Sequence, residues 1–257
     1  MNLTHILLIC RKELKSYFAS PIAYLLMAFF GLVFGATFYS ASKEMVRMAF
    51  QSQMMGQAQP MNVNDWIIRP LLGFASTITL FLLPMISMRL IAEEKRNGTI
   101  ELLLTSPVTD LDIIVGKWLG AIVLYLCVLG MSMINIVLLY MGSKPDWKPL
   151  LIGYLGLLLQ GATLLAIGTF ISTVCKNQIV AGGVTFFVCL LLWLMSWYTA
   201  NEPSPFMQGL NYIAIVTHME NFQKGLITSK DVIFYCSMIF LALFMSHRAM
   251  DALRWRA

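Results

Sequence analysis

Six long apolar segments limit what this sequence can fold into. They cover residues 21–39, 70–90, 113–141, 150–174, 179–198 and 232–246, and the last, being short, is expected to run from residue 231 toward residue 250. A transmembrane helix needs about 20 apolar residues, whereas membrane strands alternate in polarity over about 10 residues. The unbroken runs therefore predict an all-α polytopic membrane protein with six transmembrane helices, in one domain over residues 1–257.

The composition excludes most other classes of protein. Apolar residues make up 58% of the chain and charged residues only 12%, whereas about 25% of a soluble domain is charged. The formal net charge is +5, and the basic residues stand mainly at span ends, where anionic lipid headgroups account for them. We therefore expect a lipid environment and no nucleic-acid partner.

The N-terminal segment, residues 2–20, is predicted to be an amphipathic helix lying on the membrane. Apolar residues form one face of this helix, and basic residues gather on the other. Ser20-Pro21 should end the helix and turn the chain into the bilayer. A disordered basic leader is the alternative. The apolar residues recur at spacings of three and four: Leu3, Ile6, Leu7, Cys10, Leu14, Tyr17 and Phe18.

The loop at residues 91–112 has the most informative pattern. Asn97-Gly98 predicts a turn, residues 99–105 a short helix with one apolar face, and Thr109 with Asp112 a capping box that opens the third span. Such a helix suits a groove on a partner protein; a re-entrant or solvated connector is the alternative. The residues expected to take part are Glu94, Gly98, Thr99, Ile100, Glu101, Leu103, Leu104, Ser106 and Pro107.

Two segments on the opposite side are not plain spans. Residues 42–69 are polar and rich in methionine, which predicts a flexible loop after a first span that ends near residue 39. Residues 199–230 are too polar for a lipid-facing span and predict a re-entrant or interfacial segment. His218 and Glu220, two positions apart, do not share a helix face, so they are interpreted as interfacial polar residues.

Small residues inside the spans predict close helix packing. Gly31 and Gly35 form one small-xxx-small pair, and Gly116 and Gly120 form another. Lys117 stands near the inner end of its span, within snorkelling reach of the headgroups. The uncharged polar residues of the spans either pack between helices or line a path: Ser76, Thr77, Thr79, Asn135, Gln160, Thr163, Thr169 and Thr185.

Several catalytic patterns are absent from the sequence. It contains no G-x-x-x-x-G-K-[ST], no H-E-x-x-H and no G-x-S-x-G. No span centre holds an Asp or Glu, which argues against an ion-coupled carrier. We therefore expect no catalytic residue, no cofactor and no metal site.

Three motifs together resemble a known family. The run from Glu93 to Pro107, followed by Gly116-Lys117, is similar to the intracellular loop of type-2 ABC transporter permeases. The leader from Arg11 to Pro21 and the run from His218 to Gly225 are also similar. The resemblance covers nearly the whole chain and looks closest to the GldF-type permease subunits of gliding motility.

This resemblance implies a function. It implies a permease subunit of an ATP-driven ABC transporter that performs no covalent chemistry itself. Such a subunit pairs with a separate ABC ATPase subunit and with a second permease subunit, either a copy of itself or a different chain. The residue 99–105 helix would be the coupling helix, transport would be export across a bacterial inner membrane, and both termini would be cytoplasmic, as the basic residues also favour. A membrane scaffold or sensor subunit and a polytopic membrane enzyme remain as alternatives.

Overall fold

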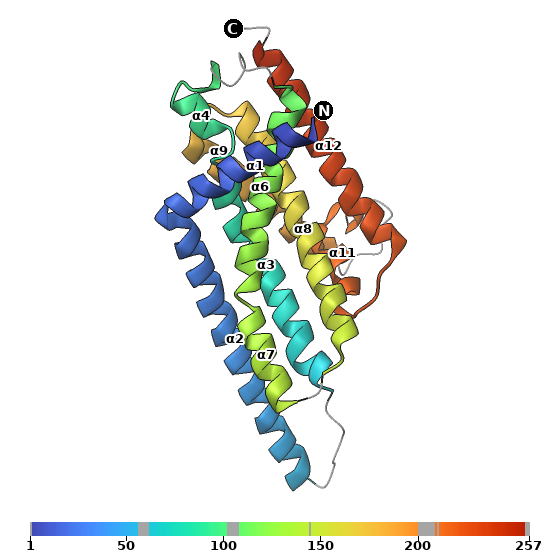
Figure 1. Ribbon diagram of the computed structural model, residues 1–257. Helices are drawn as coiled ribbons and strands as arrows, with labels where there is room; N and C mark the ends of the chain where they lie inside the picture. Colours follow the sequence, from blue (N-terminus) through green and yellow to red (C-terminus); the bar gives the residue numbers. More distant parts are fainter. Residues whose placement is uncertain are drawn as a thin grey trace.

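The computed structural model describes residues 2–55, 62–101, 108–143, 145–199, 209 and 211–254. The described chain is helical, with no strand (Figure 1). Its helices are α1 (Leu3–Ala19), α2 (Pro21–Met54), the π-helix η1 (Asn64–Ile68), α3 (Arg69–Ser87), α4 (Ala92–Arg96), α6 (Asp110–Gly130), α7 (Met133–Gly142), α8 (Trp147–Val174), α9 (Gln178–Thr199), α11 (Ile215–Gln223) and α12 (Ser229–Arg254).

Six helical stretches are long and apolar enough to cross a membrane, which confirms the predicted all-α polytopic fold class. The two shortest still have 19 and 26 residues, so each exceeds or nearly equals the roughly 20 residues that a bilayer requires. The stretches are Pro21–Met54, Asn64–Arg96, Asp110–Gly142, Trp147–Val174, Gln178–Ser196 and Ser229–Arg254.

The first span is longer than predicted. α2 runs on to Met54, through residues that the sequence analysis assigned to a flexible loop. At 1.5 Å per residue its 34 residues extend about 51 Å, well beyond a hydrocarbon core of about 30 Å. The polar composition after residue 39 marks where the chain can leave the bilayer, but no Gly or Pro stands between Gly35 and Met54 to end the helix.

The third span is interrupted near its far end. α6 ends at Gly130, Met131 and Ser132 form a turn, and α7 continues from Met133. The Ser132 hydroxyl donates to the Leu129 carbonyl oxygen and also meets the Tyr154 hydroxyl. A serine that bonds a nearby carbonyl competes with the helical pattern, and Gly130 adds backbone freedom.

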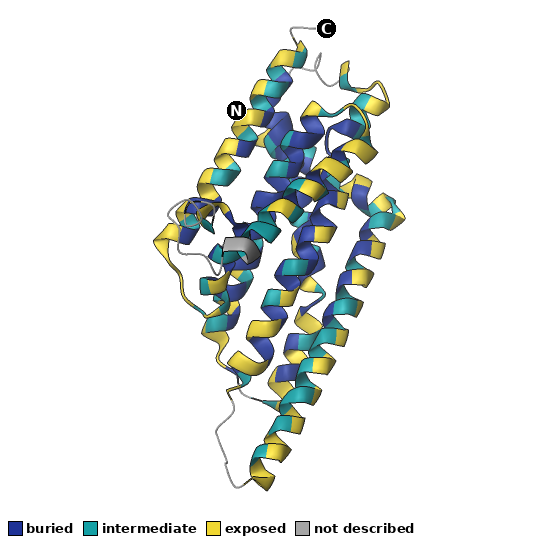
Figure 2. Ribbon diagram, turned by 180° about the vertical axis from the view of Figure 1, so that it is seen from behind, coloured by how far each residue is buried: buried dark blue, intermediate teal, exposed yellow. Residues whose placement is uncertain are grey.

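Helix α8 lies at the centre of the bundle, beside α3, α6, α9, α11 and α12. Figure 2 shows buried residues on the inner helices and exposed residues along much of α2 and α12. Glycines let the neighbours approach α8 closely. A Cβ added at Gly161 would lie 2.1 Å from Tyr125 Cε1, and one at Gly168 would lie 2.1 Å from Ser87 Oγ. The sequence analysis did not select these glycines.

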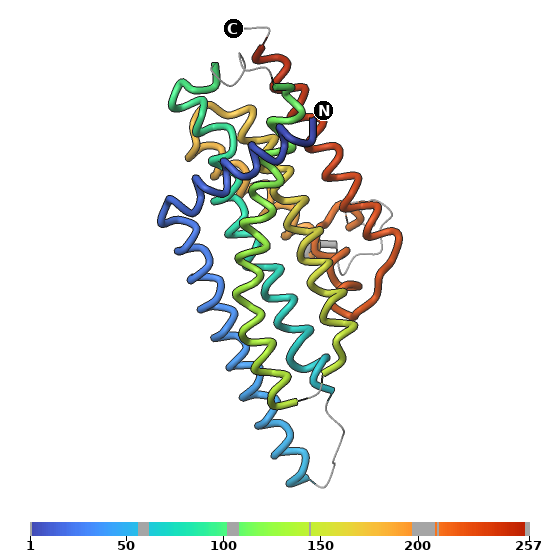
Figure 3. The backbone as a smooth tube through the Cα atoms, viewed as in Figure 1, coloured from blue at the N-terminus to red at the C-terminus, as the bar shows by residue number. Residues whose placement is uncertain are grey.

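Helix α1 crosses α6 at the end of the molecule that also carries α4 and the last turn of α12 (Figures 1 and 3); we call this the terminal end. α1 begins and ends where the sequence predicts, with Asn2 as N-cap and Ser20 before Pro21. A Cβ at Gly116 would lie 2.9 Å from Ile9 Cβ, and one at Gly120 would lie 3.0 Å from Glu13 Cβ.

The other predicted glycine pair has more room. Cβ atoms added at Gly31 and Gly35 would lie 3.6 Å from Met131 Cβ and Asn135 Oδ1, which is ordinary van der Waals contact. The face of α2 that carries these glycines therefore has room for a Cβ beside α7 and the turn that precedes it, unlike the contact of Gly116 with α1.

Helix α11 packs against α3, α8 and α9 and lies alongside α8 rather than beyond its end (Figure 1). Phe222 is fully buried, and its Cβ is where a side chain at Gly156 would clash. Gly225, with a φ of 75°, ends the helix against Pro149. α11 is therefore packed into the bundle.

Candidate functional site

The terminal end holds a buried cluster of ion pairs between α1, α4 and α6. The Lys117 ammonium is 2.6 Å from Glu13 Oε1 and 2.9 Å from Glu94 Oε1, and its side chain is 2% exposed. The snorkelling interpretation of Lys117 is therefore wrong. The side chain points at two carboxylates from separate segments, which compensate the cost of burying an ammonium group.

The cluster is balanced in charge. Lys12 adds a second ammonium group 3.5 Å from Glu94 Oε1, at the exposed edge, so two cations face the carboxylates of Glu13 and Glu94. Glu94 Oε2 is buried and has no hydrogen-bond partner within the described parts of the chain. Because an unpaired buried carboxylate is costly, Lys117 fixes α4 and α1 against α6.

Tyr17 and Arg89 fasten the neighbouring end of α3. The Tyr17 hydroxyl donates to the Ile86 carbonyl oxygen over 3.2 Å. Burial and then the negative charge of Glu13 raise the pKa of Tyr17, so the hydroxyl stays a neutral donor. Arg89 binds the Glu93 carboxylate through two nitrogens, at 3.0 and 3.2 Å. The paired donors give the start of α4 a fixed orientation.

α4 is also held by α8. The backbone N–H groups of Ile91 and Ala92 both donate to the Ser172 hydroxyl oxygen, at 3.1 and 2.9 Å, and that hydroxyl donates to the Met88 carbonyl oxygen. Lys95 donates to the Thr173 carbonyl oxygen. A single serine thus satisfies backbone groups between α3 and α4 that neither helix can satisfy itself.

The other end of the loop is fixed at the start of α6. Thr109 is the N-cap, and its side chain accepts from the Asp112 N–H, which confirms the predicted cap. The Asp112 carboxylate accepts from the Asn2 backbone N–H over 3.0 Å and lies 4.0 Å from His5 Nδ1. The first turn of α1 therefore anchors the point where the loop rejoins the bundle.

The predicted coupling residues lie between these two anchors. The turn at Asn97-Gly98 is present. Gly98 has a φ of 70°, a conformation that favours glycine, and the Thr99 N–H donates to the Glu94 carbonyl oxygen over 3.0 Å. Ile100 is half-buried against the core, and Ile100 and Glu101 are helical. Leu103, Leu104, Ser106 and Pro107 lie outside the described residues.

The sequence analysis missed how the loop is anchored. Lys117 was interpreted as a snorkelling residue, although Gly116-Lys117 formed part of the resemblance, and Ser172 was not considered. Lys117 and Glu13 stand more than a hundred positions apart, and a serine near a span end is common. The available signal was a single lysine inside an otherwise uncharged stretch of the third span.

A second polar cluster joins α11 to α12. His218 is buried, with Nδ1 2.6 Å from Asp231 Oδ1 and Nε2 2.9 Å from the Tyr212 carbonyl oxygen. The two ring nitrogens therefore link the Asp231 carboxylate on α12 to the Tyr212 carbonyl oxygen that precedes α11. Asn221 and Thr228 donate to Asp231 Oδ2. The interfacial interpretation of His218 is therefore wrong: it is a buried connection between two helices.

The uncharged polar residues of the spans mostly have partners within the bundle. The Ser76 hydroxyl donates to Gln160 Oε1 over 2.8 Å, and Gln160 Nε2 donates to the Ser76 carbonyl oxygen, which joins α3 to α8. The hydroxyls of Thr163, Thr169 and Thr185 donate to carbonyl oxygens one turn earlier in their own helices. This favours packing over the alternative of a path through one subunit.

Comparison with known proteins identifies the family. The chain is 25% identical over 162 residues to "Probable multidrug ABC transporter permease YbhR" of Escherichia coli strain K12 and, equally, of Escherichia coli O157:H7. The match covers 62% of this chain and 43% of each relative, so the chain matches less than half of their length. The family described as "ABC-2 family transporter protein" matches residues 7–247, and the chain belongs to this family.

Proposed function

We propose that the chain is the membrane subunit of an ATP-driven transporter and carries the movement of a separate ABC ATPase to the spans. The observation that carries this proposal is the anchoring of the loop at residues 91–112. One end is fixed to α6 through Lys117 and to α8 through Ser172, and the other is capped by Thr109. The family match and the curated relatives support it.

In this proposal the loop works as a lever. ATP binding on the partner displaces the residue 99–105 helix, and the stiff connections of α4 carry the displacement into α3, α6 and α8. α1 moves with them because Glu13 shares Lys117 with Glu94. The chain binds neither nucleotide nor cofactor in this scheme, and the covalent chemistry belongs to the partner.

The pathway is proposed to lie between two permease subunits. Within the described chain the polar side chains of the spans are largely paired, whereas large apolar residues of α2 and α9 are exposed, such as Leu25, Leu32 and Phe187. A second subunit or lipid would cover them. The second subunit is either a copy of this chain or a different permease chain. That the system is GldF-like rests on the resemblance alone, and export is the proposed direction.

Topology gives the first test. We propose that both termini and Arg96 face the cytoplasm of a bacterial inner membrane, because more basic residues then lie inside. Reporter fusions after Arg96 and Arg256 should be active only inside, and fusions at Gln57 and Lys144 only outside. An outward reporter at Arg96 would overturn the coupling proposal, since the loop would then face the side without ATP.

Truncation of the loop gives the second test. Each of Ile100, Leu103 and Leu104, if fully buried against the ATPase, would contribute about 1.5–3 kcal/mol, so the triple alanine variant should insert but lose both the co-purified ATPase and transport. Because Ile100 also packs against its own bundle, the Leu103→Ala, Leu104→Ala double variant should show the same loss in a chain of unchanged stability.

The matched control is Leu226→Ala, Ile227→Ala, at two exposed apolar residues before α12, which should retain the ATPase. Retention of ATPase and transport by the double variant at Leu103 and Leu104 would refute coupling through this helix. An associated ATPase with no substrate movement in the wild type would instead favour the scaffold or sensor alternative.

A further inference from the structure

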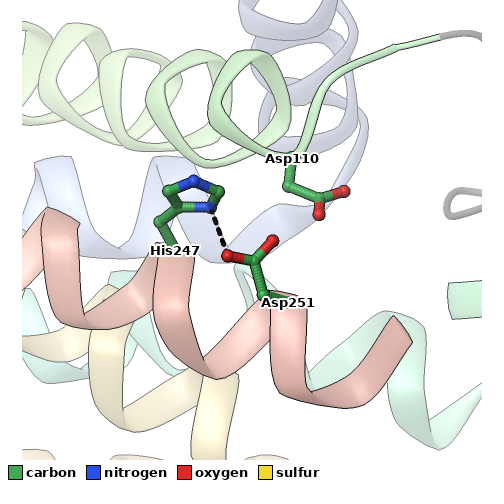
Figure 4. A group of neighbouring side chains, drawn as sticks. All are labelled: Asp110, His247 and Asp251. Carbon is green, nitrogen blue, oxygen red and sulfur yellow. Dashed lines mark ion pairs between the residues drawn. The ribbon is translucent and has the colours of Figure 1, made fainter. Parts of the chain in front are cut away.

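Three possible metal ligands meet where α12 passes the start of α6. Asp110 is the first residue of α6, and His247 and Asp251 lie one turn apart on α12 (Figure 4). One ligand atom from each residue lies within 4.8 Å of the other two. The i, i+4 spacing places the imidazole and one carboxylate on the same helix face, and the second carboxylate comes from a separate helix.

Two polar atoms of these three residues are buried without a hydrogen bond. Asp110 is 4% exposed, and its Oδ1 atom has no hydrogen-bond partner in the described parts of the chain; the same holds for His247 Nδ1. His247 Nδ1 lies 3.6 Å from Asp251 Oδ2, which exceeds a normal hydrogen bond. A buried carboxylate oxygen with no donor is costly, so the geometry calls for a cation.

Arg254 supplies only part of the positive charge that this cluster requires. Arg254 Nη1 is 3.7 Å from Asp110 Oδ2, and the Arg254 side chain is 48% exposed. This distance is too long for a strong charge-assisted hydrogen bond, and it involves the carboxylate oxygen other than the unbonded one. A guanidinium at the rim therefore leaves Asp110 Oδ1 and His247 Nδ1 without a hydrogen-bond partner in the described parts of the chain.

We propose that Asp110, His247 and Asp251 bind a divalent transition-metal ion of the zinc class. An imidazole favours zinc, iron, nickel or copper over magnesium and calcium, and carboxylates complete such sites. Three protein ligands leave a position for water, and the site opens into a cavity of about 450 Å³ lined also by Thr109 and Arg254. No metal site was expected from the sequence motifs, and local spacing could not indicate this one, because Asp110 lies far from His247 and Asp251 in the chain.

The ion would join the last turns of α12 to the first turn of α6. Asp110 directly follows Thr109, which caps the end of the coupling loop. The bound ion would therefore stiffen the point at which that loop rejoins the bundle. The binding itself does not depend on the proposed transport function, so the two can fail separately.

The test measures zinc binding by the full-length chain, purified in detergent with a tag that contains no histidine and stripped with a chelator. Titration of Zn²⁺ against a chromophoric chelator should give one site per chain. His247→Gln and Asp251→Asn should each weaken that site by at least about tenfold. Both residues are partly exposed, so the variants should unfold at the wild-type temperature without metal.

The matched control is His5→Gln. His5 also lies beside a carboxylate, Asp112, but no third ligand joins them, so its zinc affinity should be that of the wild type. Arg254→Gln removes the competing cation and should strengthen binding. Absence of a stoichiometric site in the wild type, unchanged affinity in His247→Gln, or unchanged or weaker affinity in Arg254→Gln would each overturn the proposal and leave an ordinary ion-pair cluster.

Discussion

Replacing Lys117 with methionine should destabilise the protein by about 3–5 kcal/mol, the usual cost of leaving a buried ion-pair partner uncompensated. Methionine has about the same volume as lysine, so the substitution removes the ammonium group with little change in packing. It leaves Glu13 and Glu94, which are 13% and 14% exposed, without the nitrogen at 2.6 and 2.9 Å. Lys12 compensates little, because it is 66% exposed and 3.5 Å away.

The assay is reversible unfolding in mixed micelles with increasing SDS, followed by tryptophan fluorescence. Trp118 is a suitable reporter because it neighbours Lys117 and donates from Nε1 to the Ala162 carbonyl oxygen over 3.0 Å. The matched control is Lys12→Met. It removes a lysine of the same cluster at an exposed position, where an ion pair contributes about 1 kcal/mol or less.

A third variant distinguishes charge from packing. Lys117→Met combined with Glu13→Met and Glu94→Met removes the charges that meet at Lys117 together, and replacing a whole buried ion cluster by apolar residues of similar volume is often close to neutral in stability. Stability should therefore return most of the way to wild type. A loss of less than about 1 kcal/mol in Lys117→Met, or no recovery in the triple variant, would refute the argument that uncompensated charge determines the cost.

Three further substitutions test other contacts, each by the same unfolding assay. Gly116→Ala should cost about 1–3 kcal/mol, because its Cβ would lie 2.9 Å from Ile9 Cβ, whereas Gly31→Ala has room and should be nearly neutral. Ser172→Ala should cost about 1–3 kcal/mol or more by leaving two backbone N–H groups without an acceptor, while Ser237→Ala, whose hydroxyl bonds only its own helix, should cost less. Asp231→Asn should cost about 1.5–3 kcal/mol for a weakened charged hydrogen bond to the buried imidazole, and equal stability would show that this contact does not stabilise the joint between α11 and α12.

The features that were predictable from sequence depend on local patterns. Long apolar runs fix the number of candidate spans, and the ends of α1 follow from a cap at Asn2 and from Ser20-Pro21. The predicted end of the first span was wrong for a physical reason. Hydropathy reports where a helix leaves lipid, whereas helix termination requires a stop signal, and none occurs before Met54.

The contacts that build the candidate site could not be predicted in this way. A lysine near a span end fits snorkelling as well as burial, and the choice depends on whether α1 brings Glu13 within reach. His218 and Asp231 likewise meet only because the chain turns back between α11 and α12. In both cases the sequence shows an unusual polar residue, and only the fold shows which partner it contacts.

The distribution of these contacts bears on how a displacement could travel. α4 has polar connections to α1, α6 and α8 and follows α3 after the turn at residues 88–91, so it cannot shift alone without breaking buried ion pairs or leaving N–H groups unsatisfied. Rigid connections of this kind favour movement of the helices together over bending of the loop. A partner that pushes on the loop near Ile100 would therefore act on α3, α6 and α8 as one unit. The roomier contact of Gly31 and Gly35 with α7 and the turn that precedes it is then the place where that unit could slide against α2.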